Sequence, residues 1–211
     1  MSFICKQLYS VIPTKIILLN DSFRYDDISK HEKSRTSIRD REHYLGRECA
    51  KKGLIKLGLT DTIIKSGIYG EPIWPENSIG SISHSKGHCF VAVTKRETFE
   101  SIGVDVEHFN RMKVASIYRI THPLESKFIG DDLERATILF AIKEAFYKAQ
   151  FLQSKIAMNF KDLAVEINLT DCSAAVKWID PKVKIRPNSF FKWKLYFEFN
   201  KRRVYTICYK E

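Results

Sequence analysis

Two short acidic stretches, each set inside a hydrophobic pattern, constrain the fold of this 211-residue chain more than any other feature. The first reads GVDVE at residues 103–107, and the second reads KEAFYK at residues 143–148. In both stretches, charge falls where the local periodicity predicts the hydrophobic core. A charge placed against a core needs a partner, so each stretch must find one.

The first stretch predicts a β-strand. Apolar residues alternate with other residues between Ser101 and Glu107, as a strand requires. Asp105 and Glu107 therefore leave the same face of the strand, and two carboxylates held that close favour a cation between them. Magnesium is the hard cation that prefers such oxygen ligands.

The second stretch predicts part of a long helix that runs from about Asp132 to Leu152. Glu144 and Lys148 are four residues apart, so they share one helical face. The same line of the helix continues through Phe140, which makes Glu144 a carboxylate on an otherwise apolar line. Glutamate is rarely found in such a position.

Three carboxylates and one ammonium group at these positions suggest metal-assisted chemistry on a phosphate ester. The metal would neutralise phosphate oxygens, and Lys148 would supply a further cation. A structural alternative stays open, because an exposed strand edge and an ordinary helix-surface Glu/Lys pair would produce either motif alone.

The remaining periodicities predict a mixed α/β chain. A second helix is expected from about Ile38 to Leu57, and Asp131 with Glu134 is typical of a cap that opens the long helix. Residues 85–88 can turn between two strands. Strands are expected at residues 79–83, 89–94, 102–107, 163–169, 174–179, 191–199 and 204–209.

The strand at residues 191–199 alternates apolar side chains with lysines and other polar residues. Such a strand can bind single-stranded nucleic acid through its aromatic side chains. We expect a core face instead, because the apolar side chains all leave one side of the strand. They are Phe191, Trp193, Leu195, Phe197 and Phe199.

The composition agrees with a folded protein that has an acidic partner. The formal net charge of +10 favours a nucleic acid, a phosphorylated cofactor or an acidic protein. The five cysteines show no paired metal spacing, so we expect reduced, mostly buried thiols and a cytoplasmic protein. No apolar stretch approaches the ~20 residues that span a bilayer, and residues 1–10 do not form a convincing export signal.

Three further motifs lie upstream: YLGR at residues 44–47, GEPIWP at residues 70–75 and IGSISHS at residues 79–85. With the two acidic stretches, their order and spacing resemble the 4'-phosphopantetheinyl transferases. The resemblance is to the branch that primes carrier proteins of siderophore and other secondary-metabolite synthetases, and it covers roughly Arg39 to Leu152.

This resemblance implies an α/β (α+β) fold of two similar α/β subdomains in a pseudo-twofold arrangement, with the active site in the cleft between them. In this chain, residues 1–100 would form the N-terminal subdomain with the coenzyme A phosphate contacts. Residues 101–211 would form the C-terminal subdomain with the metal-binding acids and the catalytic helix.

The resemblance also implies a reaction. The 4'-phosphopantetheine arm of coenzyme A would pass to a serine of an apo acyl or peptidyl carrier protein, with release of 3',5'-ADP. Asp105, Glu107 and Glu144 match the magnesium-binding acids of the family. Glu144 is also the expected general base, because partial burial would raise its pKa, and Lys148 would neutralise the diphosphate or help to protonate the leaving group.

Residues of the N-terminal part are expected to bind the phosphates of coenzyme A. By resemblance, Ser83 and His84 contact these phosphates, and Arg47 grips the phosphate of the nucleotide. Arg39 matches a second arginine of the family, with Arg41 as a close competitor.

Two positions have less certain roles. Lys143 lies one residue off the face of Glu144, so it is either a second-rank phosphate contact or a solvated surface residue. Glu71 stands where relatives often carry Lys or Arg for the 3'-phosphate, and a carboxylate there would repel that group. The affinity of the protein for the nucleotide is then lower, or Arg39 and Arg47 provide that affinity.

The expected protein is therefore a monomeric, magnesium-dependent transferase with an acidic carrier protein as partner and no membrane association. Two alternatives stay open. One is a basic module that binds nucleic acid and carries the acids on its surface, and the other is a member of the same fold that has lost its chemistry. The direction in which the acids point separates the first alternative from the enzyme.

Overall fold

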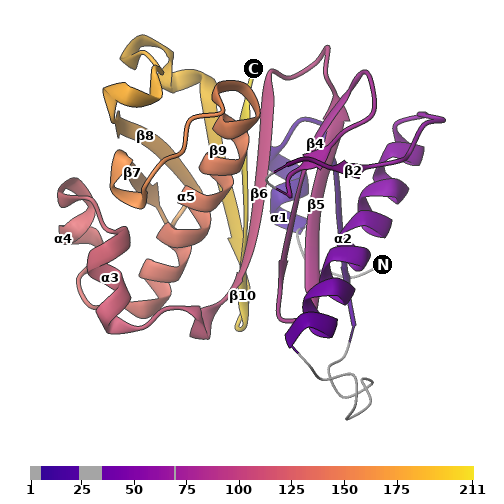
Figure 1. Ribbon diagram of the computed structural model, residues 1–211. Helices are drawn as coiled ribbons and strands as arrows, with labels where there is room; N and C mark the ends of the chain where they lie inside the picture. Colours follow the sequence, from indigo (N-terminus) through magenta and orange to yellow (C-terminus); the bar gives the residue numbers. More distant parts are fainter. Residues whose placement is uncertain (1–5, 24–34, 69) are drawn as a thin grey trace.

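The computed structural model describes residues 6–23, 35–68 and 70–211, and it shows an α+β fold of two halves placed side by side (Figure 1). The first half carries a three-stranded sheet, the second a five-stranded sheet, and each sheet is covered by one long helix. The expected α+β class is confirmed. The division into subdomains at residues 1–100 and 101–211 stays a prediction.

The first half is built from two helices and five strands in the described residues. The helices are α1 (Lys6–Val11) and α2 (Arg35–Lys56). The main sheet has the order β1-β5-β4, with antiparallel pairs throughout. Its strands are β1 (Ile17–Ser22), β4 (Ser78–Ser85) and β5 (His88–Lys95), and a small separate pair is formed by β2 (Lys65–Ser66) and β3 (Pro72–Ile73).

The predicted turn at residues 85–88 joins β4 to β5. Lys86 has a φ of 50° and Gly87 a φ of 72°. Two central residues with positive φ are what a tight two-residue hairpin needs, because this backbone twist matches the twist of the flanking strands. The expected hairpin is confirmed.

The second half holds one antiparallel sheet with the order β6-β10-β9-β8-β7. Its strands are β6 (Ser101–His108), β7 (Leu163–Asn168), β8 (Ser173–Ile179), β9 (Trp193–Phe199) and β10 (Arg203–Lys210). Its helices are α3 (Val114–Ile120), α4 (Ser126–Ile129) and α5 (Leu133–Ser154). Short 3-10 turns are η3 (Phe109–Arg111), η4 (Pro123–Glu125), η5 (Phe160–Asp162), η6 (Pro181–Val183) and η7 (Pro187–Lys192).

The long helix α5 begins as its sequence predicts, but with a different cap. The side chain of Asp132 accepts hydrogen bonds from the backbone N–H groups of Glu134 and Arg135. The expectation that Asp131 caps the helix is wrong, because the capping side chain must directly precede the first helical residue, here Leu133.

The backbone of α5 touches the backbone of β6 at Gly103. A Cβ atom at this position would overlap the carbonyl oxygen of Ala145 and lie 2.6 Å from the backbone nitrogen of Ala149. Only glycine permits this approach. The contact brings the acidic face of β6 against the acidic face of the helix.

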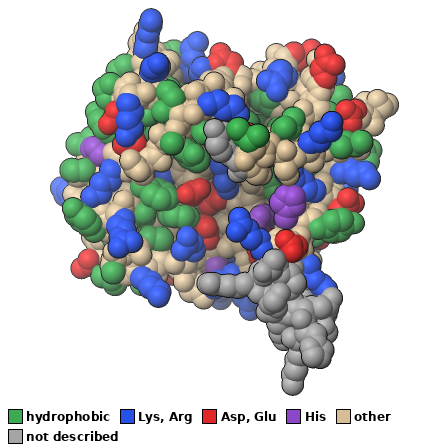
Figure 2. Space-filling view, in the orientation of Figure 1, with side chains coloured by type: hydrophobic (Ala, Val, Ile, Leu, Met, Phe, Trp, Pro, Cys, Tyr) green, Lys and Arg blue, Asp and Glu red, His purple; other side chains and the backbone are tan. Residues whose placement is uncertain are grey.

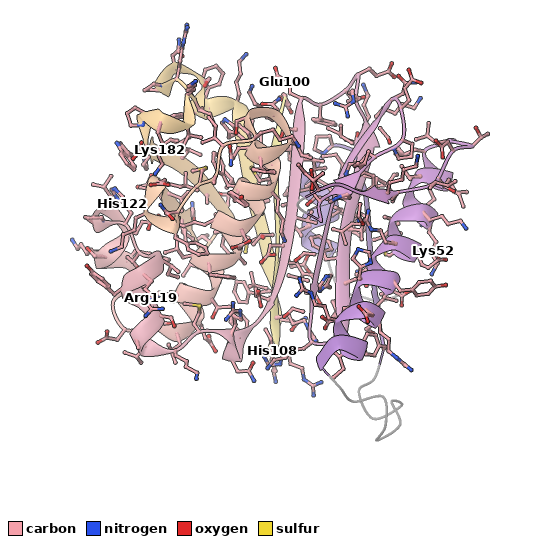
Figure 3. All side chains as sticks on the ribbon, viewed as in Figure 1. Lys52, Glu100, His108, Arg119, His122 and Lys182 are labelled. Carbon is pink, nitrogen blue, oxygen red and sulfur yellow. The ribbon has the colours of Figure 1, made fainter. Side chains whose placement is uncertain are left out.

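The alternation of β6 is confirmed, because its two faces meet different partners. Ile102, Val104 and Val106 join the buried cluster between the two sheets, together with Ile79 and Phe90. The opposite face packs on α5, as the contact at residue 103 shows. Figure 3 shows the ends of the strand, with Glu100 just before its start and His108 at its end.

The aromatic strand β9 follows the prediction only in its middle. Trp193, Leu195 and Phe197 are buried, whereas Phe191 is 71% exposed and Phe199 is 47% exposed. Phe191 lies in the turn η7, outside the strand, and Phe199 is the last residue of β9. The expected common core face is therefore wrong for the two end positions.

Four cysteines are buried thiols, as expected: Cys49, Cys89, Cys172 and Cys208. Cys5 lies outside the described residues. In the part of the chain that the structure describes, no helix is both long and apolar enough to cross a membrane.

We predict that Gly103→Ala destabilises the protein by about 2–3 kcal/mol, because the new methyl group meets backbone atoms that cannot step aside. The matched control is Gly46→Ala, where the added Cβ meets only the Ile82 side chain and the helix gains propensity. Chemical denaturation of the three proteins measures the difference. Equal stabilities would show that the β6–α5 contact is looser than described.

A second prediction concerns His88, which joins the two halves through a 3.1 Å hydrogen bond between its Nε2 and the Tyr205 hydroxyl. Burial, with the charge of Arg203, lowers the pKa of His88 from 6.5 to about 4. The unfolded chain therefore binds a proton at a higher pH than the folded protein does. Stability from this group is present above the unfolded pKa and is lost, by up to about 3 kcal/mol, as the pH falls from 6.5 toward 4.

The variant His88→Gln removes this titration and keeps a polar partner for Tyr205. We expect the difference in unfolding free energy between parent and variant to shrink as the pH falls through this window. All other titratable groups are the same in the two proteins, so their contributions cancel in this difference. Unfolding free energies measured across the window test this. A difference that does not change with pH would contradict the role given to His88.

Candidate active site

The candidate site lies where β4, β6 and α5 meet, and Asp105 is its centre. This carboxylate is 3% exposed. Its Oδ1 accepts hydrogen bonds from Lys148 Nζ and from Ser83 Oγ, both at 2.7 Å. Lys148 Nζ also donates to the carbonyl oxygen of Val104 at 3.1 Å. One oxygen of Asp105 thus connects all three elements.

The other oxygen of Asp105 has no such partner. Oδ2 is buried and accepts no hydrogen bond from the described residues. A buried carboxylate oxygen without a donor is costly, and such an atom needs an explanation. A cation bound at Oδ2 would supply one.

Glu107 lies two residues further along the same face. Its Oε2 accepts a hydrogen bond from Ser85 Oγ at 3.1 Å, and its Oε1 lies 3.6 Å from Arg111 Nε. Burial, and then the charge of Asp105, raise the pKa of Glu107 to about 7, against the opposing effect of Arg111. The site therefore disfavours a full negative charge here unless another cation is added.

Glu144 faces these acids from α5. It is half-buried and makes no hydrogen bond to the described residues. Burial, and then the charge of Asp105, raise the pKa of Glu144, which confirms the predicted direction. The carboxylate is thus free of fixed partners and held in a partly desolvated position.

The three carboxylates offer oxygen donors to a cation, although in this structure they do not converge on one point. The described residues contain no group of three or more His, Cys, Asp or Glu side chains that could together hold a metal ion. However, the charge of Asp105 raises the pKa of both glutamates, so Asp105 lies close enough to act on each of them. The buried Oδ2 and the all-oxygen donors fit a hard divalent cation. The magnesium assignment stays a prediction.

One face of α2 carries basic side chains and lies near His84 of β4. Arg39, His43 and Arg47 are spaced by four residues and share one helical face. Burial, and then the charges of Arg47 and His84, lower the pKa of His43. Sequence reasoning missed His43, although its spacing from both arginines was a usable signal.

Arg47 is the best placed of these groups to bind an anion. Its Nη2 donates to Ser66 Oγ at 3.3 Å, but its Nη1 is buried without a partner. Burial lowers the pKa of the guanidinium. An unused donor on a buried arginine fits a phosphate oxygen. Arg39 is exposed on the same face, whereas Arg41 points away from it by helical geometry.

His84 and Ser83, neighbours on β4, have different surroundings. His84 Nδ1 lies 3.2 Å from Glu42 Oε2, and the other oxygen of Glu42 accepts a hydrogen bond from Gly87 N. Glu42 therefore orients the imidazole. Ser83 is buried and gives its hydroxyl hydrogen to Asp105. The Ser83 hydroxyl thus has no second hydrogen to donate to a phosphate in this arrangement, and its contact with coenzyme A stays a prediction.

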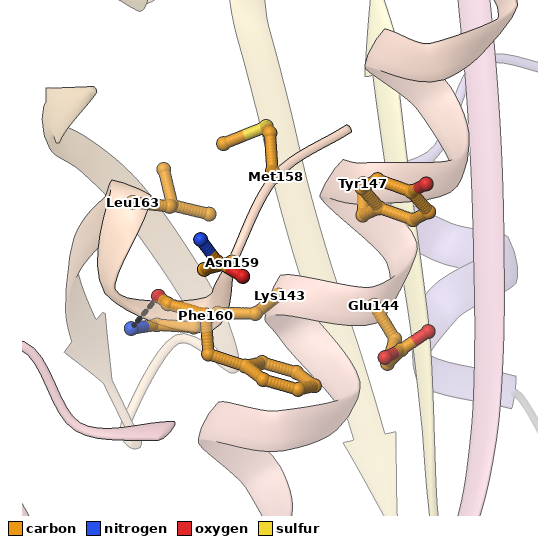
Figure 4. Close-up of a pocket in the computed structure, with 7 residues that line it drawn as sticks. All are labelled: Lys143, Glu144, Tyr147, Met158, Asn159, Phe160 and Leu163. Carbon is orange, nitrogen blue, oxygen red and sulfur yellow. Dashed lines mark hydrogen bonds between the residues drawn. The ribbon is translucent and has the colours of Figure 1, made fainter. Parts of the chain in front are cut away.

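The prediction for Lys143 needs a correction. Its side chain is buried, and Nζ donates to Glu125 Oε2 at 2.7 Å and to the carbonyl oxygens of Ile120 and Phe160, both at 2.8 Å. All three hydrogens of the ammonium group are used, so it can neither contact a phosphate nor lie in solvent. Figure 4 shows Lys143 and Glu144 leaving α5 in opposite directions.

Two pockets flank α5, and Tyr147 lines both. The first has a volume of about 90 Å³ (Figure 4). The second is larger, about 300 Å³, and lies toward β3 and β4. Lys148 and Glu71 both line the second pocket, so Glu71 lies at the rim of the candidate site.

The surface agrees with this arrangement. Figure 2 shows acidic side chains gathered between α5 and β6, with histidines beside them toward α2 and basic side chains around both. Acidic and basic side chains therefore lie near one another on this face of the molecule. Such a surface can hold an anionic ligand together with the cation that neutralises it.

Comparisons with known proteins match both halves of the chain. The family described as 4'-phosphopantetheinyl transferase N-terminal domain matches residues 31–94. The family described as 4'-phosphopantetheinyl transferase superfamily matches residues 101–208, which is more than half of the chain.

Individual relatives are more distant. The 4'-phosphopantetheinyl transferase Npt of Nocardia iowensis is 30% identical over 138 residues, which cover 64% of this chain and 62% of that protein. Enterobactin synthase component D of Salmonella typhimurium is 28% identical over 144 residues, 61% of this chain and 57% of that protein. The match thus spans about three fifths of each curated relative. The solved holo-ACP-synthase of Plasmodium yoelii is 18% identical, with a TM-score of 0.42, over 53% of this chain and 94% of that chain.

We predict that the two lysines of α5 differ in their effect on stability. Lys143→Met leaves Glu125 buried and unpaired, which should cost about 3–5 kcal/mol. Lys148→Met should cost less, because the Lys148 side chain is 28% exposed, whereas that of Lys143 is 2% exposed.

The double variant Lys143→Met/Glu125→Gln removes the stranded charge and should recover part of the loss. Denaturant unfolding of the parent and the three variants gives the values. If Lys143→Met proves no more costly than Lys148→Met, the buried pair described for Lys143 does not exist.

Proposed function

The chain belongs to the 4'-phosphopantetheinyl transferase superfamily, and from this premise we propose that it transfers the 4'-phosphopantetheine arm of coenzyme A to a serine of an apo carrier protein. One observation supports the proposal above others. The oxygen of Asp105 that has no partner among the described residues lies beside two glutamates of raised pKa, and Arg47 on helix α2 has a buried donor without a partner. A diphosphate bound with a divalent cation would satisfy these groups together.

The cationic face of α2 would bind the phosphates of coenzyme A. Arg47 offers its buried Nη1, and Arg39 lies on the same face. His84, held by Glu42 at Nδ1, would donate from Nε2 to a further phosphate oxygen when the imidazole is a cation. These groups fix the position of the nucleotide, so that the diphosphate reaches the acids.

The residues that would hold magnesium are Asp105, Glu107 and Glu144. When bound, the ion would draw negative charge from the diphosphate and so favour departure of 3',5'-ADP. Lys148, anchored on Asp105 and Val104, would place a second positive charge beside the leaving phosphate. In the absence of the ion, the same lysine is the main cation at the Asp105 carboxylate.

Glu144 would act as the general base. It has no fixed hydrogen bond in the described residues, and its raised pKa makes it a better proton acceptor than an ordinary surface glutamate. It would take the proton of the carrier serine as the serine oxygen bonds to the β-phosphorus. The bond from this phosphorus to the bridging oxygen then breaks, and 3',5'-ADP leaves with the electron pair.

The partner would be an acidic carrier protein, because the chain has a formal net charge of +10. The similarity to an enterobactin synthase component supports a carrier protein of siderophore or related secondary-metabolite synthesis. A monomeric state and a cytoplasmic location stay predictions.

The nucleic-acid module is less well supported. It requires the acids to lie on the surface, whereas Asp105 is buried and both glutamates are half-buried. The other alternative is a member of the same fold that has lost its catalytic activity. Only an activity assay distinguishes this alternative from the enzyme.

The proposal is tested by incubating the protein with an apo carrier protein, coenzyme A and magnesium, and by measuring the mass of the carrier. We expect the mass to rise by one phosphopantetheine group. Asp105→Asn keeps the shape of the side chain and should slow transfer at least ~100-fold. A parent protein that leaves the carrier unmodified overturns the transferase. A folded Asp105→Asn variant of normal rate overturns only the metal assignment.

Glu71 provides a second prediction. If it faces the 3'-phosphate, Glu71→Lys replaces repulsion by attraction and should tighten coenzyme A by ~1–3 kcal/mol. The gain should vanish for dephospho-coenzyme A, which lacks that phosphate. The control is Glu76→Lys, which makes the same charge change at an exposed position.

Calorimetric titration of both ligands against the three proteins supplies the affinities. A variant that binds both ligands as the parent does would place Glu71 away from the 3'-phosphate. A gain that Glu76→Lys reproduces would instead reflect general attraction to a more basic protein.

A further inference from the structure

The strands β4 and β6 lie next to each other without pairing through their backbones. β4 is the last strand of the three-stranded sheet, and β6 is the first strand of the five-stranded sheet. The acids of the candidate site leave β6 at this junction. The groups that cross the junction therefore decide how the acids are held.

Three alternate serines of β4 make hydrogen bonds across the junction between β4 and β6. The backbone N–H of Val104 donates to Ser81 Oγ at 3.0 Å. Ser83 Oγ donates to Asp105 Oδ1 at 2.7 Å, and Ser85 Oγ donates to Glu107 Oε2 at 3.1 Å. Because alternate residues of a strand share a face, one side of β4 presents a row of hydroxyls along β6. We call residues 81, 83 and 85 the serine row.

We propose that Ser83 and Ser85 are positioning residues that orient the two carboxylates of β6 toward a bound divalent cation. The inference rests on the proposed function, and it gives these hydroxyls a role other than contact with coenzyme A. Ser81 fixes the backbone between the two strands, and the other two serines fix the side chains.

The geometry at Asp105 shows how the positioning works. Ser83 and Lys148 both donate to Oδ1, which leaves Oδ2 as the one oxygen of this carboxylate without a bond to the described residues. Two donors from opposite elements hold the carboxylate plane in one orientation. Without the Ser83 hydroxyl, Lys148 alone would hold the group, and the carboxylate could rotate.

Glu107 depends on Ser85 more strongly. Apart from Ser85, the contact found for its carboxylate is Arg111, whose Nε lies 3.6 Å away and whose side chain is about half exposed. An exposed ion pair at that distance fixes a side chain weakly. The neutral hydroxyl of Ser85 holds Glu107 without adding a charge that would compete with a cation.

The serine row is not needed to hold the two halves together. The buried apolar cluster between the sheets already joins β4 to β6, because it contains Ile79 of β4 together with Val104 and Val106 of β6. Loss of one hydroxyl should therefore change the free energy of unfolding little. It should have a larger effect on the orientation of the carboxylate that would bind the cation. Partners that orient metal ligands typically contribute 10–100-fold to metal affinity.

The test uses manganese as a probe ion for the divalent cation, measured by calorimetric titration of the intact protein. Ser85→Ala and Ser83→Ala should each weaken manganese binding about 10-fold or more. Ser85→Thr keeps the hydroxyl at a half-buried position and should restore most of the affinity. The matched control is Ser189→Ala, which removes a hydroxyl that bonds only to Arg186 O in η7.

Melting temperatures of the same variants separate positioning from simple loss of folding. We expect Ser85→Ala and Ser189→Ala to melt alike, although only the first loses manganese. Alanine variants that bind manganese within about 2-fold of the parent overturn the inference, whatever their transfer rates. A parent that binds no manganese also overturns it, and the carrier-protein assay then decides separately whether the proposed transferase stands.

Discussion

The contact between the backbones of β6 and α5 at Gly103 is the constraint on which the rest of the site depends. Because a strand repeats every two residues, the contact also directs Asp105 and Glu107 toward the helix. Because a helix repeats every 3.6 residues, Glu144 and Lys148 on one face of α5 meet them. A larger side chain at position 103 would separate the two acidic surfaces, which the hydrogen bonds from Lys148 to Asp105 and Val104 also join.

This close approach concentrates negative charge where water is scarce. Burial, and then the charge of Asp105, raise the pKa of Glu107 and Glu144, while Lys148 partly neutralises Asp105. The opposite side of α5 is anchored by the buried pair of Lys143 and Glu125. One side of the helix is therefore electrostatically satisfied and rigid, whereas the other side keeps unpaired oxygen atoms for a ligand. The oxygen atoms on this second side would therefore gain their partners when a ligand binds, and not when the chain folds.

The sequence predicted most of the elements and the acids, because periodicity identifies which face of an element a residue occupies. It could not predict which distant group meets that face. Lys143 lies one position from Glu144, yet its partner Glu125 is 18 residues away and is brought close by turns that have no periodic signal. The bond from Ser83 to Asp105 crosses two sheets that do not pair, so neither motif contained it.

The central claim is that acids from β6 and α5 share one cation beside the cationic face of α2. Crystals of the protein grown with manganese and coenzyme A test it directly through the anomalous signal of the metal. The account predicts one strong peak about 2.1 Å from oxygens of Asp105, Glu107 and Glu144, with a diphosphate oxygen on the same ion. A peak bound elsewhere, or diphosphate bound at α2 with no metal between it and these acids, would contradict it.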